Sequence, residues 1–180
     1  AGSTRATCVF FSNLGTAYSC RFVDVPASTG HGEPIQRLFK LRDGERVIAA
    51  ISLDSRVISE IAAQKMGTEP TNHAIAVSTD GYALRFSLEP FAEPSTRGGR
   101  RFARPAQGTE IVGVATIQRG AVIIAATRQA RATLCNAREI KFLSGPGRGV
   151  ILIKLKREQD SVLGFVGSTG DRDFLTVETT

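Results

Sequence analysis

Apolar and polar positions are arranged in short segments separated by turn residues, and this arrangement recurs three times along the chain. Each recurrence opens with an apolar run that ends in a short polar turn, at residues 8–15, 74–81 and 121–128. A second β-forming run leaves each turn, at residues 17–22, 83–86 and 130–134. β-forming residues on both sides of a turn predict a β-hairpin. The pattern therefore predicts three hairpins.

Each hairpin is followed by a Gly-rich loop and a closing strand. The loops span 28–32, 95–101 and 144–149, and the closing strands 45–51, 109–114 and 160–165. The second and third openings, Ala74 and Ala121, are 47 residues apart, and a period of about 40 to 50 residues is typical of propellers. We therefore expect an all-β, single domain over residues 1–180, with about three four-stranded blades from repeats at about 8–51, 74–118 and 121–167.

Two segments fall outside the repeats. Residues 52–72 form an insertion in which Val57, Ile58, Ile61 and Ala62 have helical spacing, which favours a short helix or an irregular connection. Residues 173–180 are predicted to form a last strand, which either opens a further unit of a longer protein or completes the third unit. The absence of β-α-β alternation argues against an α/β fold.

Composition supports a soluble β-rich domain. Hydrophobic residues make up 42% of the 180, and with ten Phe and no Trp the core depends largely on Val, Ile, Leu and Ala. No run approaches the roughly 18 apolar residues of a membrane span, and no secretory signal is recognisable. We expect a cytoplasmic protein with no membrane partner.

The three cysteines lack the number and spacing of a disulfide framework or a zinc site. Cys8 and Cys20 would lie opposite each other if the first hairpin forms. We interpret them as small buried hydrophobic residues of a protein in a reducing compartment.

Positive charge is concentrated in one third of the chain. The net charge is +6, but residues 97–157 alone hold thirteen Lys/Arg against two acidic residues, a net of +11. The first 96 residues carry a net −1 and residues 158–180 a net −4. Because binding to phosphates releases counterions, a localised cluster of cations is stronger evidence for a nucleic-acid partner than a diffuse charge of the same size; the alternative that charge alone leaves open is a merely solubilising basic face.

Three clusters are the candidate DNA-binding residues. Arginine can bridge phosphate oxygens with two hydrogen bonds, and the glycines beside it would let the backbone approach phosphates closely. The first cluster is Arg97, Arg100, Arg101 and Arg104; the second is Arg148, Lys154, Lys156 and Arg157; the third is Arg128, Arg131, Arg138 and Lys141. Together they could follow one curved DNA path.

No group of residues in the sequence is a candidate active site. His31 and His73 have no carboxylate pattern beside them, and no nucleotide-binding or nucleophile-elbow string is present. Tyr18 and Tyr82 are better interpreted as strand residues. We expect no active site, no metal and no cofactor in this segment.

Several segments resemble a known family. Residues 8–18, 25–32 and 41–49 resemble a repeat of the C-terminal domain of the A subunit of bacterial type IIA topoisomerases, gyrase and topoisomerase IV. Residues 147–155 and 161–164 match the same repeat in the third unit. The resemblance covers about residues 8–167, and the insertion at 52–72 departs from it.

The resemblance implies a β-pinwheel, a propeller-like array of four-stranded blades with DNA wrapped around a basic outer rim. It also implies that the catalytic tyrosine lies outside this chain, and that the partners are double-stranded DNA, the rest of the A subunit and its ATPase subunit. In gyrase a basic Gly-rich heptapeptide close to QRRGGKG is needed for negative supercoiling. Residues 96–102 keep its double Gly and flanking Arg but not its order, which leaves gyrase and topoisomerase IV both open.

The functional hypothesis is a non-catalytic domain of an ATP-dependent isomerase that binds and bends duplex DNA through sequence-independent phosphate contacts. The alternative is a propeller-type protein-interaction module, for which affinity would depend on apolar hot spots and little on salt. An enzyme with a pocket on the propeller axis ranks last, because no convergent catalytic set is visible.

Overall fold

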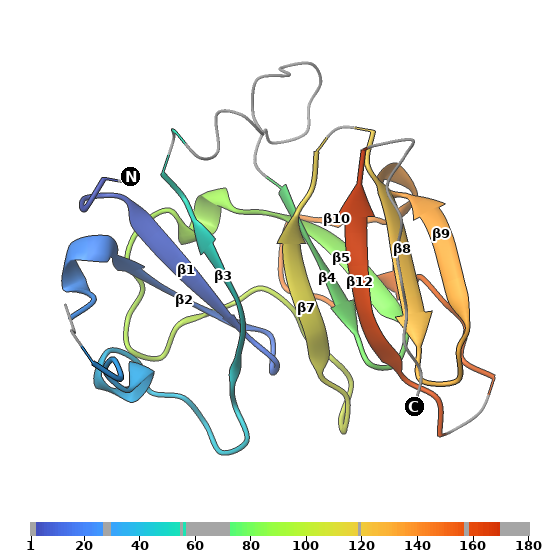
Figure 1. Ribbon diagram of the computed structural model, residues 1–180, viewed down its shortest axis with the longest axis horizontal. Helices are drawn as coiled ribbons and strands as arrows, with labels where there is room; N and C mark the ends of the chain where they lie inside the picture. The colour runs from blue at the N-terminus through green and yellow to red at the C-terminus, as the bar shows by residue number, and fades with distance from the viewer. Residues whose placement is uncertain are drawn as a thin grey trace.

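The computed structural model describes residues 3–26, 30–54, 56, 73–118, 120–156 and 159–169, and within these ranges the chain is all-β with four single-turn 3₁₀ helices (Figure 1). Nine strands build the three sheets: β1 Thr7–Ser12, β2 Thr16–Arg21, β3 Val47–Ser52, β4 His73–Ser78, β5 Tyr82–Ser87, β7 Ile111–Thr116, β8 Val122–Thr127, β9 Ala132–Asn136 and β12 Val162–Ser168. Three two-residue strands join them: β6 Arg100–Arg101, β10 Phe142–Leu143 and β11 Val150–Ile151. The 3₁₀ helices are η1 Phe22–Asp24, η2 Ile35–Arg37, η3 Glu89–Phe91 and η4 Ala137–Glu139.

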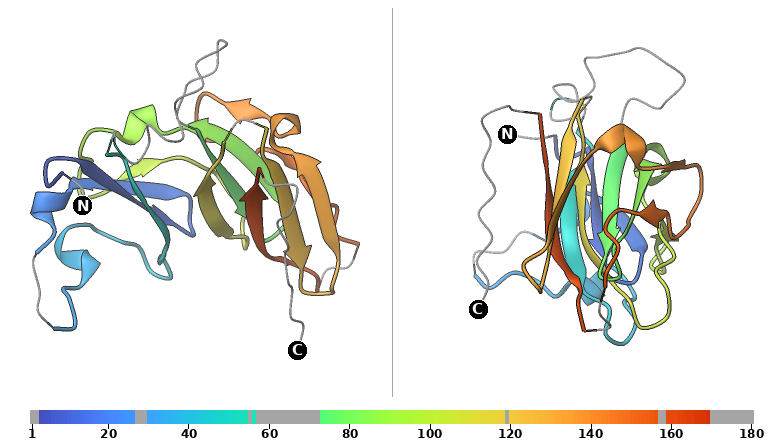
Figure 2. Two further views of the ribbon diagram at one scale, coloured as in Figure 1. Left: turned by 45° about the horizontal axis from the view of Figure 1, so that its top comes forward. Right: turned by 90° about the vertical axis from the view of Figure 1, so that its right-hand side faces the viewer.

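The strands form three blades, which follow one another along a curved path (Figure 2). Blade 1 has the order β3-β1-β2-β6, blade 2 the order β7-β4-β5-β10 with β11 also on β5, and blade 3 the order β12-β8-β9. All three predicted hairpins are confirmed, as β1–β2, β4–β5 and β8–β9. The predicted helix within 52–72 and the predicted strand at 173–180 fall mostly or wholly outside the described residues.

The outer strand of a blade comes from the next repeat along the chain. β6 belongs to the second repeat but pairs with β2 of blade 1, through Thr16–Arg101 and Ala17–Arg100. β10 and β11 belong to the third repeat but pair with β5 of blade 2. Blade 1 has the four strands that were predicted, but one of them, β6, comes from the second repeat. Consecutive repeats are therefore linked by strand exchange.

Two hydrophobic clusters lie between the blades, because β4 is buried on both faces. Ala74 and Ala76 face blade 1, whereas Ile75 and Val77 face blade 3. This explains why β4 is a continuous apolar run rather than an alternating one. On the inner side, β7 contacts both β3 and β12, so the inner strands of adjacent blades touch as in a propeller.

A cluster of phenylalanines anchors the first exchange. The Phe11 ring lies edge-on to Phe86, Phe91 and Phe102, with ring centroids 5.9, 6.0 and 5.0 Å apart. Phe102 directly follows the exchanged strand β6 and is 2% exposed. Aromatic pairs of this geometry add to the burial of apolar area, so the second repeat is held on blade 1 by packing as well as by strand pairing.

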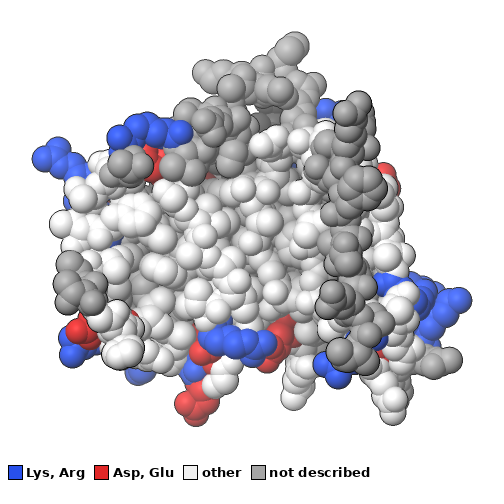
Figure 3. Space-filling model, viewed as in Figure 1, with Lys and Arg blue, Asp and Glu red and all other residues white. Residues whose placement is uncertain are grey.

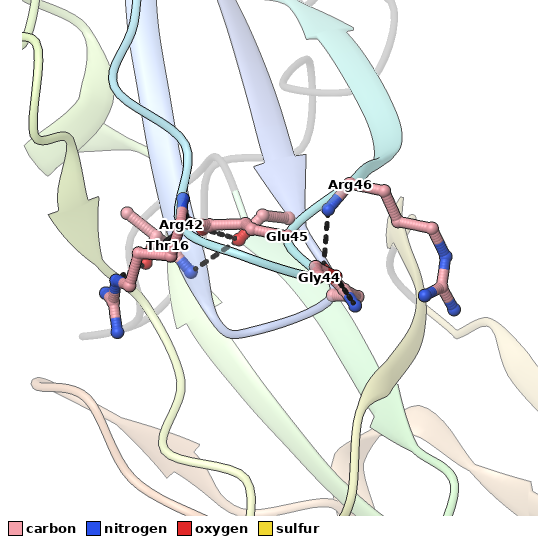
Figure 4. Close-up of polar contacts among 7 residues, drawn as sticks. Thr16, Arg42, Gly44, Glu45 and Arg46 are labelled. Carbon is pink, nitrogen blue, oxygen red and sulfur yellow. Dashed lines mark hydrogen bonds and ion pairs between the residues drawn. The ribbon is translucent and has the colours of Figure 1, made fainter.

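A polar cluster fixes the base of blade 1 (Figure 4). The Ser12 hydroxyl donates to Glu45 Oε1 at 2.5 Å, and the backbone N–H of Arg42 donates to Glu45 Oε2 at 2.9 Å. Asn13 accepts from the N–H of Arg46 and donates to the carbonyl of Gly44. The β1–β2 turn is thereby joined to the turn that precedes β3.

Cys8 and Cys20 are directly paired across β1 and β2, as expected for the first hairpin. Both are buried free thiols. Burial raises the pKa of both, that of Cys20 to about 11. They therefore behave as small core residues, as the sequence suggested.

The hairpin of blade 3 differs from the other two at its turn. Gly15 and Gly81 have φ of 80° and 85°, and the same position in blade 3 is Ala130 with φ 55°. A Cβ on Gly15 would lie 2.4 Å from the carbonyl oxygen of Ala103 in the exchanged segment. A side chain at this position therefore conflicts with strand exchange, and among the described residues no strand pairs with the outer edge of β9.

Candidate nucleic-acid interface

The two exchanged segments carry the whole first predicted cation cluster, and Arg148 and Lys154 of the second. Residues 95–104 lie on blade 1 through β6, and residues 141–154 lie on blade 2 through β10 and β11. Strand exchange thus places Arg100 and Arg101 on an outermost strand and the other cations in the adjoining loops, away from the inner strands β3, β7 and β12. The face that shows these inner strands has few charged residues, which gather at its margins (Figure 3).

Two glycines of the basic loops are required by the packing of the exchanged segments against the sheet. Gly99 has φ 69°, and a Cβ there would lie 2.7 Å from the carbonyl oxygen of Ala17; Gly149 has φ 91° and would meet the carbonyl of Ala83 at 2.0 Å. These two glycines lie against the neighbouring blade's strand. They allow the exchanged segments, and hence the cations, to lie against the sheet.

Successive loops are joined by backbone hydrogen bonds into one continuous surface, which we call the rim and define as Lys40, residues 97–104 and residues 147–154. The N–H of Lys40 donates to the carbonyl of Arg97 at 2.7 Å, which links the first repeat to the second. The N–H of Arg104 donates to the carbonyl of Gly147 at 2.9 Å, which links the second repeat to the third. The rim therefore crosses all three repeats without a break.

The predicted cations are almost all at the surface. Arg131 is half-buried, Arg157 lies outside the described residues, and the others are exposed: Arg97, Arg100, Arg101, Arg104, Arg128, Arg138, Lys141, Arg148, Lys154 and Lys156. Lys154 points to solvent between the buried Ile153 and the half-buried Leu155. The first cluster meets Arg148 and Lys154 of the second cluster on the rim.

Three residues of the third cluster, Arg128, Arg131 and Arg138, lie on blade 3, around the β8–β9 hairpin and η4. Arg131 reaches the rim, because its guanidinium donates to the carbonyl of Lys154 at 3.4 Å. Lys141 accepts from the N–H of Arg85 through its carbonyl, so it lies beside β5. The structure thus connects part of the third cluster with the second rather than placing all twelve residues in one patch.

The partners of the rim arginines decide how much charge they present. Arg97 and Arg100 donate to the backbone carbonyls of Gln36 and Pro90, which hold the guanidinium groups without neutralising them. Arg148 is different: it pairs with Asp80 Oδ2 at 2.7 Å, and its guanidinium lies 3.7 Å from the centre of the Tyr82 ring. Its charge is therefore partly compensated.

Two cations were missed by the sequence reasoning. Lys40 is exposed on the rim, although the first 96 residues together carry a net charge of −1. The signal that could have found it is its position four residues before Gly44, which matches Arg104 before Gly108. Arg85 is 6% exposed, and its Nε donates to the carbonyl of Ile140 at 2.7 Å, which gives it a structural position.

Both tyrosines and His73 contact neighbouring side chains, whereas His31 is exposed. Tyr18 is 1% exposed, and burial together with a hydrogen bond to Glu45 raises its pKa to about 12. The Tyr82 ring is covered by Arg148, and the His73 ring contacts Phe142. Within the described part of the chain, no group of His, Cys, Asp and Glu side chains could hold a metal ion, and no helix is long and apolar enough to cross a membrane.

The blades and their exchanged outer strands define a β-pinwheel, the propeller-like class expected from the repeats. The profile of the family described as "DNA gyrase C-terminal domain, beta-propeller" matches residues 6–54, 72–104 and 121–166. The chain belongs to this family.

One curated relative, the A subunit of DNA gyrase from Aminobacterium colombiense, is 27% identical over 163 residues, which are 90% of this chain and 18% of the relative. This chain therefore corresponds to less than a fifth of that relative's length.

Three solved structures share the fold. The C-terminal domain of DNA topoisomerase IV has a TM-score of 0.77 and 16% identity, and the match covers 93% of this chain and 48% of that one. The E. coli ParC C-terminal domain has a TM-score of 0.71 and 17% identity, over 91% and 62% of the two chains. The DNA gyrase A C-terminal domain has a TM-score of 0.63 and 16% identity, over 92% and 48%.

Proposed function

We propose that this chain is a non-catalytic, DNA-binding part of a type II topoisomerase A subunit, and that duplex DNA lies along the rim. The observation that carries the proposal is the continuity of the rim: backbone hydrogen bonds join the exposed cations of three repeats into one surface. Contacts would be to phosphates and independent of sequence, because a DNA backbone presents the same charges at every base pair.

The curvature of the blade array favours bending of the bound duplex. Bending a site of about 20 to 30 base pairs costs roughly 1–6 kcal/mol by elastic estimates. Several charge-assisted contacts to arginine and lysine would offset this cost. Binding would therefore wrap the duplex partly around the outer strands and present it to the catalytic part of the enzyme.

The whole protein would be an ATP-dependent isomerase of the cytoplasm, assembled from the A subunit and an ATPase subunit. Its DNA-cleaving tyrosine would lie outside this chain. The burial of Tyr18, which is 1% exposed, supports this assignment, because its hydroxyl is not accessible to a DNA phosphate. Phosphate contacts by side chains need no cofactor.

A binding series with a duplex of about 40 base pairs tests the proposal. Each phosphate contact contributes about 0.9 to the slope of log affinity against log salt. Replacing Arg97, Arg100 and Arg101 by glutamine should therefore lower the slope by about 2.7. The matched control replaces Arg5, Arg21 and Arg37, which are exposed on blade 1 and off the rim, and should leave the slope unchanged.

Absence of binding at low salt, or equal slopes for the two triple variants, would reject the rim as the DNA site. Unfolding curves of both variants exclude a loss of fold as the cause.

A protein-interaction module is the second candidate, favoured by an apolar surface on blade 1. Phe22, Val23 and Val25 are 36%, 64% and 40% exposed. They lie near a cavity lined by Phe10, Pro26, Ile35 and Leu38. If this surface carries the main function, Val23→Asp should abolish binding to the rest of the A subunit, while DNA binding by the wild-type chain is weak and insensitive to salt.

A further inference from the structure

Lys40, Arg104 and Lys154 occupy equivalent positions in the three repeats. The N–H of Lys40 donates to Arg97 of the next repeat, and the N–H of Arg104 donates in the same way to Gly147. Arg97 and Gly147 are themselves equivalent, since each lies two residues before the glycine, Gly99 or Gly149, that rests on the preceding blade's second strand. Lys40 and Arg104 thus make the same contact with the following repeat.

The third member of the set is identified by its neighbours. A Cβ on Gly15 would meet the carbonyl oxygen of Ala103, and a Cβ on Gly81 would meet that of Ile153. Lys154 therefore follows Ile153 as Arg104 follows Ala103. In each repeat a buried apolar residue, Phe39, Ala103 or Ile153, is followed by an exposed cation.

Lys40 stands out from the other cations of its segment. Arg37 pairs with Glu33 at 2.8 Å, Arg42 lies 3.9 Å from Glu45, and Arg46 pairs with Glu110 at 2.5 Å. Among the described residues no ion pair involves Lys40, Arg104 or Lys154. Two of the four acidic residues of the first repeat, Glu33 and Glu45, are therefore engaged by neighbouring arginines, and the charge of Lys40 remains available.

We propose that Lys40, Arg104 and Lys154 form a ladder of phosphate contacts, one from each repeat. This inference rests on the proposed DNA-binding function and deepens it. The DNA path then begins over blade 1, a part of the chain whose overall charge gives no sign of DNA binding. An ammonium group on an exposed, backbone-anchored position is suited to contact a phosphate as a point charge.

Single substitutions test the ladder. Lys40→Gln, Arg104→Gln and Lys154→Gln should each lower the salt slope by about 0.9, so that raising salt from 50 to 200 mM costs about threefold less affinity than it costs the wild type. Arg37→Gln is the matched control: it removes an exposed cation that lies three residues from Lys40 and is paired with Glu33. It should bind as the wild type does.

The outcomes separate this inference from the proposed function. If the wild type shows no steep salt slope, the DNA-binding proposal fails and the ladder fails with it. If Arg104→Gln and Lys154→Gln lower the slope but Lys40→Gln matches Arg37→Gln, DNA binding stands and the ladder is overturned, since the path does not reach blade 1. Urea unfolding of each variant shows whether a change in fold contributes.

Discussion

Gly81 and Ile153 lie so close together that a Cβ on Gly81 would stand 2.2 Å from the carbonyl oxygen of Ile153. This contact brings the third repeat onto blade 2, where the carbonyl of Gly81 accepts from the N–H groups of Leu152 and Ile153. The glycine is needed twice: for its φ of 85° and for the space that the exchanged segment fills. Strand exchange therefore depends on the hairpin turn of the accepting blade.

Gly81→Ala should destabilise the chain more than the same change at a glycine with free space. Gly108 has φ 75° and no atom within 4 Å of its would-be Cβ, so Gly108→Ala incurs only the left-handed strain of about 1–2 kcal/mol. Gly81→Ala adds displacement of the exchanged segment and should exceed that cost by at least about 1 kcal/mol. Urea unfolding measures both, and equal losses would contradict the role given to the close approach.

Ala130→Gly should not destabilise blade 3. Ala130 already holds a φ of 55°, and glycine adopts that conformation without strain. Its larger backbone entropy in the unfolded chain opposes this gain, so the free energy of unfolding should stay within about 1 kcal/mol of the wild type. A loss comparable to that of Gly81→Ala in the same urea experiment would show that the Ala130 side chain has a packing role.

Arg85 and Arg101 should respond to substitution in opposite ways. Arg85→Leu removes the hydrogen bond to the buried carbonyl of Ile140 and should cost about 1–3 kcal/mol of stability, with little change in the salt slope of DNA binding. Arg101 is exposed on β6, so Arg101→Gln should leave the unfolding curve unchanged and lower the slope by about 0.9. A reduced slope for folded Arg85→Leu would place Arg85 at the DNA.

The hairpins could be predicted because their signal is local. The apolar runs around Gly15 and Gly81 are long enough to show period and turn together. Strand exchange could not be predicted, because β6, β10 and β11 are only two residues long and have no period. Their place is set by contacts with another repeat, such as that of Phe102 with Phe11.

The candidate site was predictable to a similar degree. Clustering of charge identified the rim cations Arg100, Arg101 and Arg104, since charge is a property of composition. It overlooked Lys40, because the sequence does not show which acidic residues are already paired with other arginines. It also did not reveal that Asp80 compensates Arg148, since these residues are 68 positions apart and meet only through the exchange.

Glu45 should make the fold sensitive to acid. Burial raises its pKa, but hydrogen bonds from Ser12, from the N–H of Arg42 and from Tyr18 outweigh burial and lower the pKa below the ordinary value. A depressed folded pKa gives stability that is complete above the ordinary carboxyl pKa of about 4.3 and is lost as the pH falls through the folded value. Glu45→Gln removes this dependence.

The stability difference between wild type and Glu45→Gln should therefore be largest near pH 7 and should shrink between about pH 5 and pH 3. Urea unfolding at a series of pH values measures it. Glu33→Gln is the control, because Glu33 is exposed and lies outside the polar cluster of blade 1. A stability difference between wild type and Glu45→Gln that stays constant over this pH range would contradict the charged, hydrogen-bonded state of Glu45.

Asp80 should weaken DNA binding by holding the charge of Arg148. Its carboxylate pairs with the Arg148 guanidinium at 2.7 Å on the rim, where it would also repel phosphates. Asp80→Asn removes one negative charge and frees Arg148, so affinity for duplex DNA should rise and the salt slope should increase by up to about 0.9. The pair is partly exposed, so its loss should change stability by no more than about 1 kcal/mol.

Tyr82→Phe keeps an aromatic ring under the guanidinium and should leave binding unchanged. Unaltered affinity in Asp80→Asn across the salt series would mean that the DNA path passes beside Arg148 without contacting it.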